Sequence, residues 1–545
     1  MIKFLARTSA FLVIPVLILA RPSLADPISL KLALENLLNN QPATILGIKG
    51  RRMDSTRIGE TLLKRYQEQD MQPVWVTPEG PGTRAAILYE TLKAAPEEGL
   101  RSEDYGVGEI ESLWSHRNDE DLAKLEILLS VGLAAYAADA REGRADSRKS
   151  DSESFAVGSN APVDPAELAV EAVRTEDLAK YLASQPPGHA QYQRLKKALA
   201  DYRALAALGE WEPVPEGATI EAGMRNERIV KVRARLKRTG DLAPDSPESP
   251  LYDEALVTAV KQFQKRFHRE IDGAIGKKTV AAMNIPISQL IRRIIINMER
   301  WRWLSHDLGD KRIFVNIAGF YLQGSHNETI DLFMPVIVGE QYHKTPVFSG
   351  AIKYLEFNPY WNIPPSIVSN ELYPELLKDP NHLKKKKIRI FSGTGNDAVE
   401  VNSSTIDWTE VGRSGINRYR LRQDPGPKNS LGNVKFIFPN PFHVYLHDTP
   451  TQSLFKRSRR DFSHGCIRVA RPLELAAYLL GGAEKGWDIK KMEKIIKSRK
   501  RTIVNLEKPY PIHILYRTAA VGDDGLVYFA DDLYGRDQLL EKALF

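Results

Sequence analysis

A stretch in the last fifth of the chain combines a nucleophile with a base. It contains Cys466, the only cysteine among 545 residues, and His447 nineteen residues earlier. A cysteine thiolate attacks acyl groups, and a neighbouring imidazole can accept the thiol proton. Gly465 permits a tight turn where a substrate approaches the backbone and where successive amides stabilise an oxyanion. The stretch predicts acyl transfer with Cys466 as nucleophile, His447 as base and Gly465 in the catalytic turn.

Two other interpretations of these side chains remain open. A lone cysteine excludes an internal disulfide framework, so Cys466 is either a reactive thiol or an inert core residue. A zinc site made from His443, His447, His464 and Cys466 has suitable ligand types. However, the histidines spaced by four lie in a strand pattern, and no HExxH motif is present. These features argue against zinc. We expect no metal, and the sequence implies no organic cofactor.

The residues around the base predict a β-strand. His443, Tyr445 and His447 occupy alternate positions and share one face of such a strand. His447 lies nearest the following turn and is the better base, whereas His443 is expected to be a partly buried, hydrogen-bonded histidine. Arg468 lies on the same face as Cys466, where it favours the thiolate or binds a carboxylate.

These motifs resemble those of a known family. HDT at 447–449 followed by SHGCIR at 463–468 resembles the signature of L,D-transpeptidases of the YkuD type. NPYWNIP (358–364), RQDPGPKNSLG (422–432) and YLHDTP (445–450) are similar to the larger periplasmic, YcbB-like members. The resemblance covers the C-terminal half strongly and the N-terminal part only by architecture.

The resemblance implies an acyltransferase of cell wall biogenesis that maintains cell shape and is a carbapenem target. Cys466 attacks the third residue of a tetrapeptide stem, expels the terminal D-alanine and passes the acyl group to an amine, diaminopimelate to diaminopimelate. By motif position, the implied substrate-binding residues are Tyr445, Ser463, His464, Arg468, Trp361 and Asn362. The alternatives are an L,D-carboxypeptidase, a wall cysteine peptidase and a non-enzymatic wall-binding scaffold. Papain-like wall peptidases place Cys before His, the reverse of the order here.

The first 25 residues predict a secretory signal peptide. Lys3 and Arg7 precede an apolar run from Ala10 to Ala20, and Ser23 and Ala25 are small cleavage positions. We therefore expect export to the periplasm of a Gram-negative bacterium, with no stable membrane span after cleavage.

The length indicates several domains. Residues 26–225 carry helical apolar spacing and predict a mostly helical scaffold domain, and 286–310 predict a linker helix. Residues 226–285 resemble the three-helix peptidoglycan-binding domain. Its usual positions match Phe263, Gln264, Asp272, Gly273, Ile275, Gly276 and Thr279.

Short β-type runs separated by Gly, Pro and Asn begin at Arg312 and predict a mainly β catalytic domain over 311–545. Within it, residues 361–423 form a long insertion beside the catalytic residues, which is typical of a lid. The family's larger members carry a capping subdomain there. The predicted fold class is multidomain α+β.

The charge balance excludes nucleic-acid binding. The net charge of +7 falls to about +4 without the predicted signal peptide, and no basic block is interleaved with aromatic residues. The expected partners are peptidoglycan stem peptides and glycan strands, together with other wall synthases or hydrolases.

Overall fold

The computed structural model describes residues 27–40, 55–145, 163–393 and 398–545. The predicted signal peptide lies outside the described residues. Contacts divide the chain into two compact units. The first comprises Met1–Ala95, Arg101–Ala137 and Asp164–Ala183, and the second comprises Pro96–Leu100, Ala138–Val163 and Ser184–Phe545. Among the described helices, none has both the length and the apolar character required to cross a membrane.

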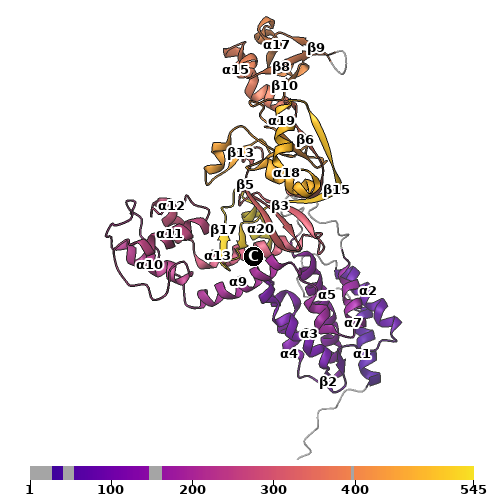
Figure 1. Cartoon of the computed structure of the whole chain (residues 1–545). Helices are drawn as coiled ribbons and strands as arrows, with labels where there is room; N and C mark the ends of the chain where they lie inside the picture. Colours follow the sequence, from indigo (N-terminus) through magenta and orange to yellow (C-terminus); the bar gives the residue numbers. More distant parts are fainter. Residues whose placement is uncertain (1–26, 41–54, 146–162, 394–397) are drawn as a thin grey trace, which may run out of the picture. The chain divides into compact units, whose positions relative to one another are not determined.

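The first unit is helical, as the apolar spacing predicts. Its helices are α1 (Pro27–Asn40), α2 (Ser55–Glu68), α3 (Thr83–Lys93), α4 (Val107–Leu113), most of α5 (Asp119–Glu142), α7 (Pro165–Arg174) and α8 (Leu178–Ala183) (Figure 1). The fully buried Glu126 of α5 accepts hydrogen bonds from the Tyr66 hydroxyl at 2.6 Å and from the amides of Val74 and Trp75 at 2.7 and 2.8 Å. These donors satisfy a carboxylate that would otherwise be costly to bury.

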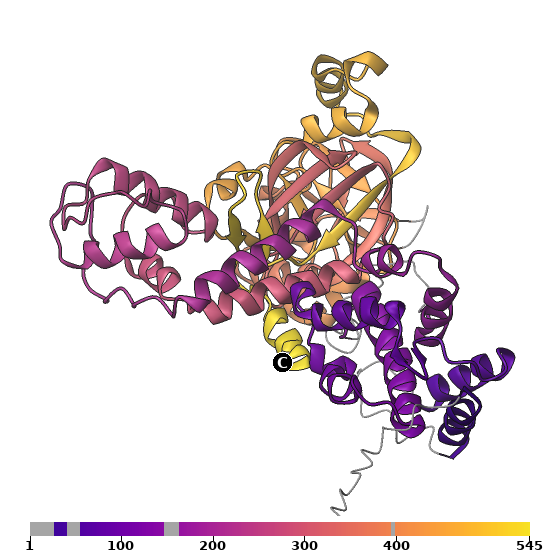
Figure 2. The ribbon, with the colours of Figure 1, turned by 90° about the horizontal axis from the view of Figure 1, so that it is seen from below.

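The second unit begins with α9 (Ala190–Ala207), which packs against α13 (Ile287–Arg302); the two long helices run side by side in Figures 1 and 2. By their contacts, residues 184–225 group with the C-terminal part of the chain. In this unit the Tyr192 hydroxyl donates to Glu98 at 2.7 Å and accepts from Arg302 at 2.9 Å. The domain limits expected from the sequence stay predictions.

Three helices form the region that resembles a peptidoglycan-binding domain: α10 (Arg228–Arg238), α11 (Glu254–Arg266) and α12 (Lys277–Met283). Gln264 holds the turn between α11 and α12, donating to Asp272 at 2.8 Å and accepting from the Gly273 amide at 2.9 Å. Beside it, Arg266 forms a fully buried ion pair with Asp241 at 2.6 Å. The motif residues Gln264, Asp272 and Gly273 thus have structural roles.

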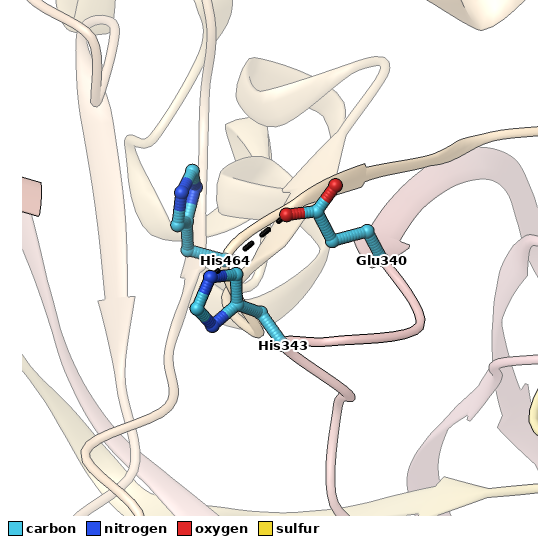
Figure 3. Close-up of side chains that lie close together, drawn as sticks. All are labelled: Glu340, His343 and His464. Carbon is cyan, nitrogen blue, oxygen red and sulfur yellow. Dashed lines mark ion pairs between the residues drawn. The ribbon is translucent and has the colours of Figure 1, made fainter. Parts of the chain in front are cut away.

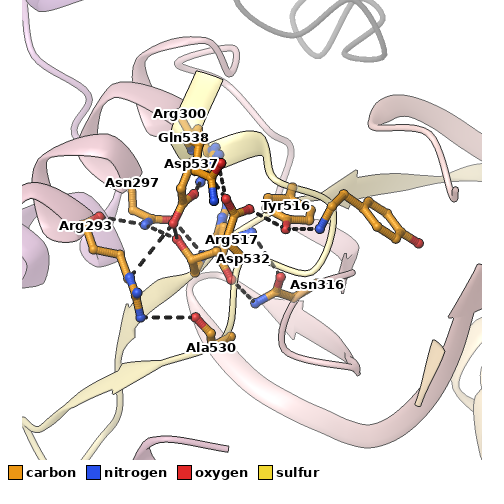
Figure 4. Close-up of polar contacts among 12 residues, drawn as sticks. Arg293, Asn297, Arg300, Asn316, Tyr516, Arg517, Ala530, Asp532, Asp537 and Gln538 are labelled. Carbon is orange, nitrogen blue, oxygen red and sulfur yellow. Dashed lines mark hydrogen bonds and ion pairs between the residues drawn. The ribbon is translucent and has the colours of Figure 1, made fainter. Parts of the chain in front are cut away.

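Helix α13 is fastened to the C-terminal segment by a polar network (Figure 4). Asn297 and Thr518 exchange two hydrogen bonds of 2.9 Å, and the Thr518 hydroxyl donates to Asp537 at 2.7 Å. Arg300 pairs with the same Asp537 at 2.6 Å. Asp537 belongs to α20 (Arg536–Leu544), so the network ties the predicted linker helix to the catalytic region.

The catalytic region contains a nine-stranded mixed sheet. Its order is β13-β5-β14-β12-β11-β6-β15-β3-β4, and β4 also pairs with β5, which closes eight of the strands into a ring. The strands are β3 (Lys311–Asn316), β4 (Tyr321–His326), β5 (Thr329–Gly339), β6 (Phe348–Phe357), β11 (Val434–Ile437), β12 (Leu446–His447), β13 (Asp461–Ser463), β14 (Ile467–Val469) and β15 (Thr502–Leu515). Helices α18 (Pro472–Leu480) and α19 (Ile489–Lys497) follow β14.

The predicted insertion forms a separate four-stranded sheet in the order β7-β10-β8-β9. Its elements are β7 (Trp361–Asn362), α14 (Pro365–Ile367), the π-helical η3 (Val368–Leu372), α15 (Tyr373–Lys378), α16 (His382–Lys385), β8 (Ile388–Ser392), β9 (Val399–Val401), α17 (Trp408–Gly415) and β10 (Arg420–Gln423). Trp408, Leu376 and Leu421 belong to its own hydrophobic core. Its ends meet because Gln423 pairs with Trp361 across β10 and β7.

Candidate active site

Two parallel neighbouring strands bring the predicted nucleophile and base together. In the β12–β14 pair, His447 lies opposite Arg468, and the Ile467 amide donates to the Tyr445 carbonyl at 3.1 Å. Cys466 directly precedes β14 and Tyr445 directly precedes β12. The nineteen-residue separation along the sequence therefore becomes adjacency in the sheet.

The turn before Cys466 is fixed by polar contacts. Gly465 has φ = +100°, a conformation that residues with a Cβ rarely adopt. The Ser463 hydroxyl donates to the Cys466 carbonyl and accepts from the Gly465 amide at 3.2 Å. The Gly465 carbonyl accepts from Thr345, which is fully buried, at 2.9 Å. The Gly465 amide is thus engaged by Ser463, although the sequence placed it among the oxyanion donors.

His447 is held as a neutral base. Its Nδ1 lies 2.5 Å from the Asp448 carbonyl, so Nδ1 carries the proton and Nε2 is the accepting nitrogen. Burial lowers the pKa of His447 to about 3, and the charges of Arg468 and Lys435 act in the same direction. The Asp448 carboxylate accepts hydrogen bonds from the amides of Asn433 and Thr449, at 2.8 and 2.7 Å.

Cys466 is a neutral thiol in this state. Burial raises the pKa of the thiol, whereas hydrogen bonds from Tyr445 and the charges of Lys435 and Arg468 act in the opposite direction. Within the described part of the chain, no hydrogen bond joins Cys466 to His447; the Sγ atom lies 4.0 Å from the His443 carbonyl. Proton transfer between them therefore requires the substrate or a small rearrangement, as is common in unliganded enzymes.

Lys435 was missed by the sequence analysis. It lies on β11 directly opposite His447, and its ammonium group is 3.8 Å from the centre of the Tyr445 ring. Burial lowers the pKa of Lys435, while the nearby Glu356 acts to raise it. The sequence did contain a sign of a functional residue, namely a lysine inside the apolar run VKFIF (434–438). Apolar strands rarely carry an unpaired cation.

The remaining predicted residues occupy two places. Ser463 ends β13, His464 belongs to the catalytic turn that follows it, and Arg468 belongs to β14. Trp361 packs against the insertion core, and Asn362 beside it is exposed. The exposed His464 reaches the insertion, since its Nε2 lies 2.5 Å from Glu371 of η3.

The predicted environment of His443 is wrong. His443 is exposed and has φ = +56°, so it is neither in a strand nor partly buried. The cause is a turn organised by Asn440, whose side-chain oxygen accepts from the Phe442 and Val444 amides at 3.1 Å each. Among the described residues, the alternative zinc set that includes His443 is not gathered into a metal-binding group.

Comparison with known families agrees with this arrangement. Residues 310–502 match a model described as "L,D-transpeptidase catalytic domain", 225–283 match "Putative peptidoglycan binding domain", and 60–199 match "Scaffold domain". The chain therefore contains an L,D-transpeptidase catalytic domain of the YkuD type together with a domain of the peptidoglycan-binding type. The predicted family resemblance and the multidomain α+β fold class are confirmed.

A curated protein of Haemophilus influenzae named "Putative L,D-transpeptidase" is 32% identical over 256 residues, which are 47% of this chain and 50% of that protein. The chain thus spans half the length of this relative. An L,D-transpeptidase structure from Mycobacterium smegmatis is 12% identical and covers 38% of this chain and 58% of that one, with a TM-score of 0.17. The structure of an L,D-transpeptidase in complex with imipenem is 13% identical. The match covers 38% of this chain and 59% of that one, with a TM-score of 0.18. TM-scores this low add nothing to the fold assignment.

Proposed function

We propose that this protein is a periplasmic L,D-transpeptidase that cross-links peptidoglycan through a thioester on Cys466. The observation that carries the proposal is the placement of Cys466 and the neutral His447 at adjacent parallel strands, beside the cations Lys435 and Arg468. A half-buried thiol flanked by a base and two positive charges suits a nucleophile that must ionise only when a substrate is bound.

In the first half-reaction, Sγ attacks the carbonyl of the third residue of a tetrapeptide stem, and the thiol proton moves to Nε2 of His447. The Cys466 amide and the Tyr445 hydroxyl are the proposed oxyanion donors, because the Gly465 amide already donates to Ser463. Collapse of the tetrahedral intermediate breaks the peptide bond, and His447 returns the proton to the leaving D-alanine amine. The product is a thioester with the shortened stem.

In the second half-reaction, His447 removes a proton from the attacking amine, which we propose to be the side-chain amine of diaminopimelate in another stem. The amine nitrogen bonds to the thioester carbonyl, the C–S bond breaks, and the proton held by His447 passes to the departing sulfur to restore the thiol. Lys435 and Arg468 stabilise the departing thiolate, because both charges favour its ionised form.

The insertion is the proposed substrate cap. Its Glu371 contacts His464, two residues before the nucleophile, so a stem that enters the site passes beneath η3. Trp361 and Asn362 stand at the base of the insertion and are proposed to contact the stem.

A basic cavity of about 1210 Å³ is the proposed docking place for the wall polymer. It is lined by Lys265 at the end of α11, by Arg457 and Arg460 from the segment before β13, and by the stacked rings of Tyr321 and Phe333. Cations suit stem carboxylates, and the exposed ring of Phe333 suits a sugar face. We expect Arg457→Glu to reduce retention on isolated sacculi while leaving carbapenem acylation unchanged.

The two hydrolytic alternatives differ only in the acceptor. If water replaces the amine, the same thioester gives an L,D-carboxypeptidase or a wall peptidase. Incubation with tetrapeptide-rich sacculi, followed by mass spectrometry of released muropeptides, separates them. We expect diaminopimelate-to-diaminopimelate dimers; tripeptides alone indicate a carboxypeptidase, and a muropeptide profile that the wild-type chain leaves unchanged favours a scaffold.

A further inference from the structure

We propose that Glu340, His343 and His464, joined by Glu371, form a zinc-binding site beside the catalytic turn. One ligand atom from each of the first three lies within 4.8 Å of the others (Figure 3). His343 and Glu340 are 3.9 Å apart, and the two imidazole rings have centroids 4.8 Å apart. Glu371 adds a second carboxylate at 2.5 Å from His464.

The donor set favours zinc over hard divalent ions. Two imidazoles and two carboxylates match zinc, which takes His and Glu ligands at about 2.0–2.2 Å in tetrahedral sites. Hard ions such as Mg²⁺ prefer six oxygen ligands and are disfavoured by the two nitrogens. The four side chains are all partly exposed, so an ion can enter from solvent.

The backbone that carries these ligands is already ordered. The turn is closed by a hydrogen bond of 3.0 Å from the His343 amide to the Glu340 carbonyl, and the Glu340 amide donates to the Ser463 carbonyl at 2.9 Å. Thr345, which is fully buried, bridges the Gly339 amide and the Gly465 carbonyl, both at 2.9 Å. Only small side-chain movements are therefore needed to bring the ligand atoms to coordination distance.

The site connects three separate segments. Glu340 and His343 follow β5, His464 belongs to the catalytic turn, and Glu371 belongs to the insertion. A bound ion would tie the insertion to the turn that carries Cys466, and stems would no longer enter beneath η3. This consequence, inhibition by zinc, rests on the proposed function; the binding itself does not.

The binding test uses the full chain with Cys466→Ala, so that the thiol cannot act as a ligand. Isothermal titration with Zn²⁺ should show one site, and Mg²⁺ should show none. His343→Ala and Glu340→Gln should each weaken zinc binding by at least about tenfold, because each removes a ligand. His326→Ala, which changes an exposed histidine on β4, is the matched control and should leave the affinity unchanged.

The activity test uses the intact thiol. Zinc should slow carbapenem acylation of the wild-type chain, and His343→Ala, which retains basal acylation, should resist this inhibition. Zinc binding that is absent in Cys466→Ala, or equal in His343→Ala and His326→Ala, overturns the site. Binding without inhibition overturns only the proposed closure of the insertion, whereas failure of acylation in the absence of zinc speaks against the proposed function instead.

Discussion

The low pKa of His447 leads to a quantitative prediction about pH. A histidine with an ordinary pKa near 6.5 is only about 3% neutral at pH 5, so a reaction that needs the neutral base slows about 30-fold. With a pKa of about 3, His447 remains about 99% neutral at pH 5. We therefore expect the second-order rate of Cys466 acylation by a carbapenem, followed by intact-protein mass spectrometry, to be flat from pH 8 down to pH 4.5.

Arg468 supplies the internal control, because its charge is the second cause of the low pKa after burial. Arg468→Met should raise the pKa of His447 and shift its acid limb toward higher pH, whereas Arg468→Lys should shift it less. His447→Gln should slow acylation by about 10²–10⁴-fold at every pH. A wild-type acid limb with an apparent pKa between 6 and 7 that disappears in His447→Gln would refute the assigned environment.

The pH range must stop at 4.5 because the same burial affects stability. The folded-state pKa of His447 lies below its unfolded value, so the unfolded chain binds the proton first. Stability is therefore full above about pH 6.5 and declines as the pH falls toward 3. Circular dichroism at each pH shows whether the chain is still folded. It therefore separates a rate loss caused by unfolding from one caused by protonation of His447.

Three further outcomes are expected. Cys466→Ala should abolish the carbapenem adduct while the melting temperature changes little, because a single sulfur atom is lost from a half-buried side chain; an adduct that persists assigns the nucleophile elsewhere. Replacing residues 363–421 with a short linker should leave a folded barrel that acylates slowly, since the insertion has its own core; wild-type rates would contradict the cap. Arg266→Met should cost about 3–5 kcal/mol of unfolding free energy by leaving Asp241 buried without its partner. The more exposed pair of Arg269 and Asp531 is the control, and its loss should cost less than about 1 kcal/mol.

The helices could be predicted because local spacing determines them. The linker helix predicted over residues 286–310 contains α13, and the helical spacing predicted over residues 26–225 includes α5. The catalytic motif was equally accessible, since its residues are close in sequence and chemically distinctive.

The surroundings of the site could not be predicted, because they arise from pairing between distant strands. Lys435 faces His447 only through the register of β11 and β12, and Glu371 meets His464 across more than ninety residues of sequence. His443 shows the opposite failure: its alternating pattern is typical of a strand, but the side chain of Asn440 stabilises a turn instead.

Strand β15 has a consequence for the order of folding. It lies between β6 and β3, pairing with β3 in parallel although nearly two hundred residues separate them. Such long-range pairing carries a large loop-closure cost and slows folding. The ring of strands cannot close until residues 502–515 have left the ribosome, so a chain truncated before Thr502 should lack a native barrel even though both catalytic residues are present. The active site is thus assembled only after almost the whole chain has been synthesised.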